Sequence, residues 1–371
     1  MNAQYTNYSL LTDLTTSNED LEVIINAVNE KYNNSFWRTL TDVLPASQSK
    51  KFSTIIEETG ITVKASVIGG SSRKPLRSFE GGAMYSDSMP KIGHGFNFDQ
   101  SDINKIKELN LVNANLAQMA AEKYLNRTTK LLSGFHATWN GWIYQALSTQ
   151  TILLDNLGGA TQTVDLHTKA ANKVKCKGSA GWFTGGTTAV IADDLQRMNK
   201  IADDQGMPAS RAFVCSKTLF DKIMANAAFI ASIKATMPLA SAETYLSPRR
   251  IAAMASTVFD IPPIVSIDEV SRIEVDGVPT LDTADFNVDK ISLIPLSKLF
   301  NMHNSPSDYL DDNNPATFKA VTEGGLIGSI QMFSSDPITV LTNFESWTFP
   351  TFKNPDFIVS LDSTLFSSTG A

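Results

Sequence analysis

The tract between residues 51 and 100 most limits how this chain can fold, because it cannot bury itself. Two strand-like pieces, 52–56 and 61–68, are followed by the glycine pairs Gly69-Gly70 and Gly81-Gly82, by prolines and by few apolar residues. Connections of this length without internal structure are uncommon inside compact domains and are usually functional or ordered by a partner. Because the backbone and apolar groups of the tract need partners, we predict an extended β-hairpin loop at 51–100 that contacts another subunit.

The same tract holds the most concentrated positive charge of the chain. Arg73, Lys74 and Arg77 lie within five residues, and Phe79 and Tyr85 follow shortly after. Positive side chains of this kind can neutralise nucleic-acid phosphates. However, the whole chain has a net charge of −7, and no stacking platform accompanies the cluster. We therefore rank subunit contact first and predict these five residues as interface residues. A flexible linker is the competing interpretation, and the aromatic residues argue against it.

Helical periodicity is strong on both sides of this tract. Residues 1–50 resemble an arm, in which a helix at 18–32 has a narrow apolar face and would dock on another part of the protein. Residues 102–132 predict a helix about 45 Å long at the usual rise per residue. We expect Gly134 to interrupt it, and a second helical piece to follow at 137–147. A helix of this length acts as a strut.

The remainder of the chain alternates between helices and strands. We expect a helix opened by Thr188, a strand at 211–215, a helix capped by Ser216 and another opened by Ser247-Pro248. Further strands are predicted at 263–267, 289–295, 326–333, 338–349 and 357–361, with a hairpin at 272–281. The predicted fold class is α+β.

Composition places the chain among ordinary globular proteins without a membrane span. Its 371 residues are 42% hydrophobic and 19% charged, and no stretch approaches the roughly 18 uninterrupted apolar residues that a membrane helix requires. The first ten residues are polar, which argues against a secretory signal. Cys176 and Cys215 match no metal-ligand spacing, so we expect reduced, partly buried thiols.

One segment resembles a phosphate-binding loop. Gly181, Gly186 and Thr188 have the spacing of such a loop before a helix, but Thr187 stands where the lysine would contact the phosphates. A glycine-rich hinge before a helix is the favoured interpretation, and a nucleotide-binding enzyme remains a weak alternative.

The other residues that could carry chemistry are scattered. No pair of histidines has the spacing of a zinc site on a helix, and we expect His136 to be a packed helix residue. Asp308 and its neighbours lack the glycine and glutamate of a calcium loop. The pairs Asp193-Asp194 and Asp203-Asp204 are expected on the solvated face of their helix. The sequence therefore predicts no catalytic residue, no cofactor and no metal site, and we expect a structural subunit and not an enzyme.

Three stretches together resemble the major capsid proteins of tailed bacteriophages, which have the Hong-Kong-97-type fold. Residues 101–134 are similar to the spine helix, 189–226 to the opening of the axial domain, and 262–295 to its central strands. The resemblance implies an N-terminal arm at 1–50, an extended β-hairpin loop at 51–100, a peripheral domain with the spine helix at 101–188 and 334–371, and an axial domain at 189–333.

The resemblance also implies a function. Copies of such a protein form hexamers and pentamers of an icosahedral shell around double-stranded DNA. The expected partners are other copies, a separate scaffolding protein, the portal, possible decoration proteins and non-specifically bound DNA. The expected location is the virion, after synthesis in the host bacterial cytoplasm. The alternative is the shell of a cellular encapsulin-like nanocompartment. Some family members link a loop lysine to a neighbour's asparagine, for which Lys74 and Asn354 are formal candidates.

Overall fold

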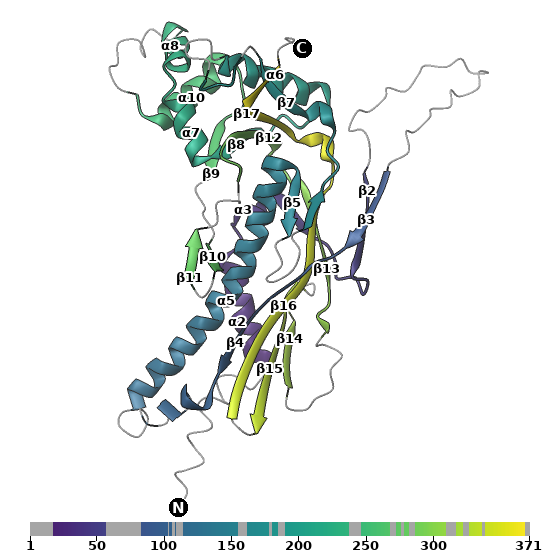
Figure 1. The fold of residues 1–371 in the computed structure, drawn as a ribbon, viewed down its shortest axis with the longest axis vertical. Helices are drawn as coiled ribbons and strands as arrows, with labels where there is room; N and C mark the ends of the chain where they lie inside the picture. Colours follow the sequence, from purple (N-terminus) through teal and green to yellow (C-terminus); the bar gives the residue numbers. More distant parts are fainter. Residues whose placement is uncertain are drawn as a thin grey trace, which may run out of the picture. The chain divides into compact units, whose positions relative to one another are not determined.

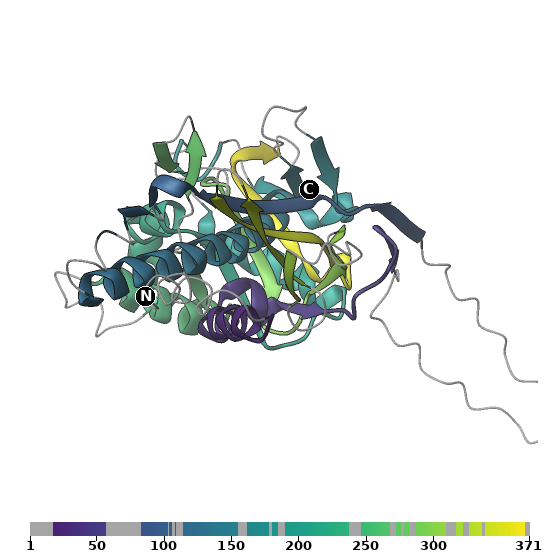
Figure 2. The same ribbon diagram turned by 90° about the horizontal axis from the view of Figure 1, so that it is seen from below.

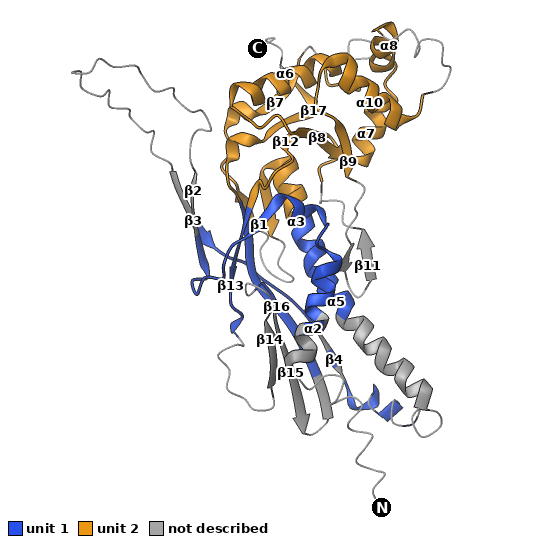
Figure 3. Ribbon diagram, turned by 180° about the vertical axis from the view of Figure 1, so that it is seen from behind, with its two compact units in different colours: residues 1–53, 86–140, 301–351 blue, residues 54–85, 141–300, 352–371 orange. Residues whose placement is uncertain are grey.

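The computed structural model describes residues 18–56, 83–102, 104–105, 108, 114–154, 162–177, 180–184, 190–236, 246–267, 272–275, 278–281, 286–308, 317–321, 326–335 and 338–367. Figure 1 shows the elements that they form. The chain divides into two compact units, which Figure 3 colours separately. Unit 1 comprises residues 1–53, 86–140 and 301–351, and unit 2 comprises residues 54–85, 141–300 and 352–371.

Unit 1 is built on a sheet whose central strand is long. This strand, β16 (Ile338–Phe352), has the neighbours β13 (Phe300–Ser305) and β15 (Gly328–Ser335). The edge strands are β1 (Thr41–Val43) and β14 (Thr317–Val321), and β4 (Lys91–Phe98) also pairs with β16. The β4 register runs antiparallel from Lys91 opposite Trp347 to Phe98 opposite Val340. The last part of the 51–100 tract is thus fixed to β16 over eight residues.

The arm docks on other elements of unit 1, as the sequence predicted, and part of it contacts the long helix. The arm contains α2 (Asn18–Lys31) and the short α3 (Phe36–Leu40), and the long helix is α5 (Ala114–Thr149). The end of α2 lies beside α5, which Figure 2 shows from below. Tyr32 stacks on His136 of α5 with ring centroids 4.2 Å apart, and Trp37 is fully buried beside Trp139. On the apolar face of α2, Ile25 and Val28 are buried, and this helix packs against β14.

The predicted break at Gly134 is wrong, because α5 continues through that residue without interruption. A Cβ at position 134 would lie 3.1 Å from Nε2 of His94 on β4. Because Gly134 has no side chain, the imidazole of His94 can lie close to the helix. The surrounding packing outweighs the low helix propensity of glycine, which costs about 1 kcal/mol relative to alanine. The helix ends at Thr149, and Gln150 follows in the left-handed conformation with φ 57°.

Unit 2 contains a mixed five-stranded sheet. Its order is β7 (Lys173–Lys177), β17 (Val359–Ser367), β12 (Lys290–Pro295), β8 (Arg211–Ser216) and β9 (Ile264–Ile267). The central strand β12 is antiparallel to both β17 and β8, whereas the outer pairs β17–β7 and β8–β9 are parallel. Besides the end of α5, the helices in the described part of unit 2 are α6 (Ile191–Asp204), α7 (Lys217–Met224), α8 (Ala227–Thr236) and α10 (Pro248–Phe259).

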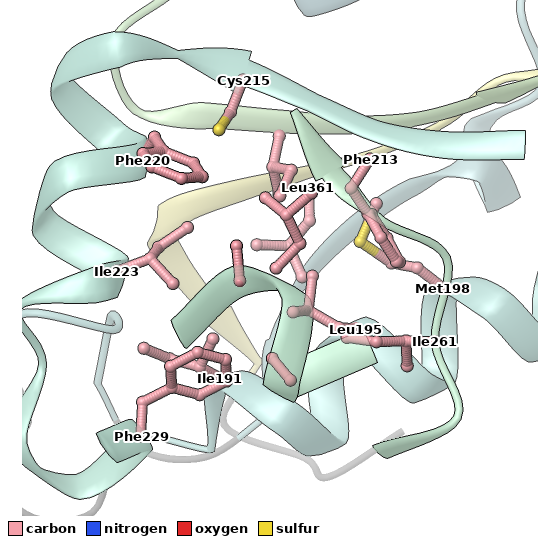
Figure 4. Close-up of a cluster of buried hydrophobic side chains, with 14 of the residues drawn as sticks. Ile191, Leu195, Met198, Phe213, Cys215, Phe220, Ile223, Phe229, Ile261 and Leu361 are labelled. Carbon is pink, nitrogen blue, oxygen red and sulfur yellow. The ribbon is translucent and has the colours of Figure 1, made fainter. Parts of the chain in front are cut away.

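The core of unit 2 follows from the alternation of side chains along these strands. Phe213, Ile291 and Leu361 belong to one apolar cluster with residues of the four helices, and Figure 4 shows part of this cluster. The next residue along β12, Ser292, points to the opposite face and donates a hydrogen bond to the carbonyl of Leu147. Because β8 is buried at all six positions, both faces of the sheet centre are covered.

Local sequence rules place two of the four described helix starts of unit 2 correctly. The Ser216 hydroxyl accepts a hydrogen bond from the Leu219 amide at 3.2 Å and caps α7, and Pro248 occupies the first turn of α10. Helix α6 begins at Ile191, later than the predicted start at Thr188, after Val190, which offers no side-chain cap. Thr188 itself lies outside the described residues.

The remaining elements are short. The predicted hairpin is confirmed by β10 (Arg272–Val275) and β11 (Val278–Leu281), in which Val275 lies opposite Val278. A second antiparallel pair joins β5 (Thr151–Leu154) and β6 (Gln162–Asp165). Two 3₁₀ turns are η1 (Ala170–Asn172) and η5 (Pro355–Phe357). The predicted α+β class is confirmed.

Candidate subunit interface

The predicted interface residues lie mostly beyond the part of the chain that the structure describes. Arg73, Lys74, Arg77 and Phe79 are all outside the described residues. Tyr85 belongs to β3 (Ala83–Ser88), which pairs with β2 (Lys51–Ile56), and only its backbone is described. The role of these five side chains in subunit contact therefore stays a prediction. What the structure does describe is the root of the tract, where the chain leaves unit 1 and returns to it.

Apolar packing holds both stems of the hairpin root. Phe52 of β2 is buried and stacks on Phe349 of β16, with ring centroids 5.1 Å apart, and its ring also faces His303 at 5.2 Å. On the returning stem Met89 is buried, and its amide donates a hydrogen bond of 2.8 Å to the carbonyl of Lys50. The two stems are thus joined to each other and to the central strand of unit 1.

A charged cluster, the root clamp, lies beside this packing and consists of Lys50, Lys91, Asp308, Glu345 and Trp347. Lys50 forms an ion pair with Asp308, and the Nζ atom of Lys91 lies 2.5 Å from Glu345 and 3.6 Å from Asp308. Both ammonium groups also lie over the Trp347 ring, at 4.6 Å and 5.7 Å from its centroid. One lysine comes from each stem, so the clamp ties both stems to the same patch of unit 1.

Burial divides the two carboxylates of the root clamp into different roles. Glu345 is 3% exposed, and it also accepts hydrogen bonds from the Ser307 hydroxyl and from the Asp308 amide at 3.0 Å. A buried carboxylate with this set of donors is costly to disturb. Asp308 is largely solvent-exposed, and the hydrogen bond and charge of Lys50, with a contribution from Lys91, lower its pKa. Its pairs are therefore weaker contributors to stability.

The root clamp was not predicted from sequence. Lys50 and Asp308 are 258 positions apart, and Asp308 was considered only as part of a calcium loop. Only the position of Lys50 and Lys91 near the two ends of the 51–100 tract could have drawn attention to them. No local pattern indicates which carboxylates they meet.

His136 is a packed residue of α5, as predicted. It is fully buried, its Nδ1 atom accepts a hydrogen bond from Trp37 Nε1 at 3.3 Å, and its Nε2 atom lies 3.0 Å from Asn29 Oδ1. Burial, with the charge of Arg38, lowers its pKa from 6.5 to about 3. A neutral ring with its proton on Nε2 fits both hydrogen bonds. Through these bonds His136 links α5 to the arm.

The glycine-rich segment that resembles a phosphate loop packs against β17 where it is described. A Cβ at Gly181 would lie 2.6 Å from the carbonyl oxygen of Ser363, and the Trp182 amide donates to that oxygen at 2.9 Å. The absence of a side chain at this position is thus explained by close packing on a strand. Residues 185–189, which complete the motif, lie outside the described residues.

The turn at Trp182 also contacts Asp194, which was wrongly predicted to lie on a solvated face. Asp194 is fully buried and accepts hydrogen bonds from Trp182 Nε1 at 2.8 Å, from the Lys177 amide at 2.9 Å and from Arg197 at 2.9 Å. Burial raises its pKa, and the donors act in the opposite direction. Asp193 beside it is exposed, as expected. The sequence pattern put both residues on the solvated face, and nothing local in the sequence indicates the Trp182 partner.

Other potential chemistry is limited in the described part of the chain. Among the described residues, no group of three histidine, cysteine or acidic side chains could hold a metal ion. Cys176 and Cys215 are free thiols that are fully buried, not partly buried as predicted, and burial raises the pKa of both to about 12, which favours the protonated thiol. The side chain of Asn354 caps η5 by accepting from the Asp356 amide at 3.0 Å, and its suggested link to Lys74 stays a prediction. Within the described helices, none has the length and apolar character to cross a membrane.

Comparison with known proteins then decides the class of the molecule. The family model for phage major capsid protein E matches residues 48–362. The chain belongs to the phage major capsid protein E family. It is therefore a capsid shell protein and a component of the virion, not an enzyme, and it associates with copies of itself. No curated protein matches the sequence.

A solved structure agrees with the fold of this capsid protein. A protein of an E. coli CFT073 prophage, assigned as its capsid protein, has a TM-score of 0.55 at 10% identity, covering 93% of this chain and 98% of that one. The procapsid of satellite phage P4 gives 0.46 at 9% identity with 99% of both chains covered, and the mature capsid of bacteriophage PhiM1 gives 0.46 at 10% identity with 90% and 88% covered. The prophage match supports the fold, and the predicted Hong-Kong-97-type class is confirmed.

Proposed function

We propose that this capsid protein assembles as hexamers and pentamers into an icosahedral shell around double-stranded DNA. The observation that carries the proposal is the family match over residues 48–362, which covers both compact units. In the proposal the protein is made in the host bacterial cytoplasm and functions in the virion. A family defined by phage shells favours this proposal over a cellular nanocompartment.

The proposed division of the chain follows the four predicted parts. These are an arm at 1–50, an extended loop at 51–100, a peripheral domain at 101–188 and 334–371, and an axial domain at 189–333. The long helix α5 and the long strand β16 support a peripheral domain, and the mixed sheet with its four helices supports an axial domain. Unit 2 also contains β5 to β7 and all of β17, which the proposal assigns to the peripheral domain.

In the proposed shell the loop at 51–100 lies across a neighbouring subunit and contacts it through Arg73, Lys74, Arg77, Phe79 and Tyr85. The root clamp supports this role, because a loop that reaches a neighbour needs both of its stems fixed in direction. Without such anchoring, ordering the stems would add to the entropic cost of every contact that the loop makes.

The proposed partners follow from the same assembly. A separate scaffolding protein would guide the copies, a portal would replace copies at one position, and decoration proteins could bind outside. Contact with the packaged DNA would be non-specific and dependent on salt concentration. The net charge of −7 is consistent with weak DNA contact by this chain itself.

The proposal is tested by electron microscopy of the purified protein, with and without a co-expressed scaffolding protein. We expect rings or closed shells. A strictly monomeric protein under all assembly conditions would contradict the proposal.

The proposed role of the loop is tested by comparing two alanine variants. Replacing Arg73, Lys74 and Arg77 by alanine should reduce assembly, whereas replacing three exposed lysines elsewhere (Lys130, Lys173 and Lys200) should have little effect. Both variants lose the same charge, so equal loss of assembly would point to net charge and not to the loop.

A further inference from the structure

Large apolar side chains that remain exposed are concentrated in unit 2. Among the side chains whose exposure is described, eight large apolar ones are exposed, and all except Val23 belong to unit 2. Three of them are Phe183 at 38%, Val288 at 44% and Leu365 at 50%. Single exposed apolar residues need no explanation, but a group at one place marks a contact surface.

Backbone hydrogen bonds hold these three residues in one neighbourhood, although they come from distant parts of the sequence. The Ser363 amide donates to the carbonyl of Asp289 at 2.8 Å, which joins the chain beside Val288 to the chain beside Leu365. The Ser363 carbonyl in turn accepts from the Trp182 amide at 2.9 Å, which places Phe183 next to the same strand. The three residues therefore lie around one short stretch of chain, where β17 has an irregularity between Asp362 and Phe366 and β12 is about to begin.

One ion pair lies beside this group. The Nζ atom of Lys222 lies 3.9 Å from Asp289 Oδ1 and 5.7 Å from the centroid of the Phe183 ring. An apolar centre with a self-neutralised ion pair at its side matches the composition of a protein–protein contact, in which the core lacks unpaired charge. It does not match a nucleic-acid contact, which requires unpaired positive charge.

We infer that Phe183, Val288 and Leu365 form a contact patch for a second copy of this chain in the shell. A second copy is the occupant because the capsid protein associates with itself, and the inference rests on the proposed assembly. In a ring of subunits the contact is heterologous, so the patch on one copy meets a different surface on the next. The patch lies outside the 51–100 loop, so it adds a contact that does not depend on the loop.

The test is the double variant Val288→Ser/Leu365→Ser, compared with Leu296→Ser. Leu296 is 57% exposed and follows the opposite end of β12, about 25 Å away along an extended chain. Thermal unfolding should show that all three proteins are folded. We expect the double variant to raise the protein concentration needed for assembly by at least about tenfold, since two apolar side chains lose their burial. Leu296→Ser should assemble like the wild type.

A photo-cross-linking residue, p-benzoylphenylalanine at position 365, identifies the occupant directly. Illumination of assembled particles should give dimers of this chain, and mass spectrometry should place the second attachment site on a surface other than position 365. Adducts with a different protein, unchanged assembly of the double variant, or an equal defect in Leu296→Ser would each overturn the inference. If the wild type itself never assembles, the proposed function fails together with this inference. If the wild type and the double variant assemble alike, only the inference fails.

Discussion

At the scale of residues, the polar groups buried inside the two units matter more for stability than those on the surface. Asp194 in unit 2 and His136 in unit 1 are both fully buried, and each satisfies hydrogen-bond donors or acceptors from segments distant in sequence. Removing either side chain leaves its partners without hydrogen bonds in a place that water does not reach. The exposed ion pairs of the chain have water as a replacement partner.

Asp194→Ala is expected to lower the free energy of unfolding by about 3 kcal/mol, because the Trp182 and Lys177 donors and the Arg197 charge lose their acceptor. Urea denaturation measures the change. The matched control is Asp193→Ala on the same helix, whose exposed side chain should change stability by no more than about 0.5 kcal/mol. Equal effects of the two substitutions would contradict the role given to Asp194.

His136 should make the protein sensitive to acid. Its pKa is about 3 in the folded state and near 6.5 when unfolded, so the unfolded chain binds the proton first as the pH falls. The contribution of the neutral His136 ring to the free energy of unfolding is fully present above pH 6.5 and is lost as the pH falls from 6.5 to about 3. The slope is at most about 1.4 kcal/mol per pH unit.

The measurement for His136 is urea denaturation of the wild type and of His136→Gln at several pH values. The difference in their free energies of unfolding should narrow as the pH falls through this range. Other titrating groups, such as the buried His303, act equally in both proteins and cancel. A difference that stays constant from pH 7 to pH 4 would show that the imidazole is not held neutral.

At the scale of elements, the stems of the hairpin are fixed by contacts on one side of unit 1. Phe52 packs on β16, Met89 binds the Lys50 carbonyl, and the root clamp joins both stems to Asp308 and Glu345. Glu345 is the buried member of the clamp, and it also orders the chain at Ser307 and Asp308. The stems therefore depend on this one carboxylate more than on Asp308.

Glu345→Gln should loosen the hairpin root while keeping its shape. The substitution removes the charge that faces Lys91, and the amide group offers a donor where the Ser307 hydroxyl and the Asp308 amide also donate. We expect amide hydrogen exchange at Met89, whose amide binds Lys50, to become at least about fivefold faster, which corresponds to roughly 1 kcal/mol of local stability. Asp308→Asn should have a smaller effect, because that side chain is exposed. An unchanged exchange rate at Met89 in Glu345→Gln would refute the clamp.

The elements that sequence predicted correctly are those with local signals. Ser216 and Pro248 mark helix starts through interactions with their own next turn, and the hairpin at 272–281 follows from its two-residue connection. Gly134 was misjudged because its reason lies in His94, a residue of another element. The root clamp and the burial of Asp194 were missed for the same cause, since a single sequence does not show which distant residues meet.

At the scale of the whole molecule, the order of elements was more informative than any residue. The predicted sequence of arm, tract, long helix, mixed domain and returning strands was sufficient to reach the capsid family, which the match over residues 48–362 shows. The interface residues Arg73, Lys74, Arg77, Phe79 and Tyr85 remain predictions, because their side chains lie outside the part of the chain that the structure describes.

The position of β17 has a consequence for how the protein is made. This strand lies between β7 and β12 in the interior of the unit 2 sheet, yet it comes from residues 359–367. A ribosome synthesises the chain from its N-terminus, so the sheet stays open until this late segment has emerged. A chain that is cut short before Val359 exposes two unpaired strand edges and cannot complete its core. A product truncated before β17 therefore does not reach the folded state, and an unfolded product cannot take part in assembly.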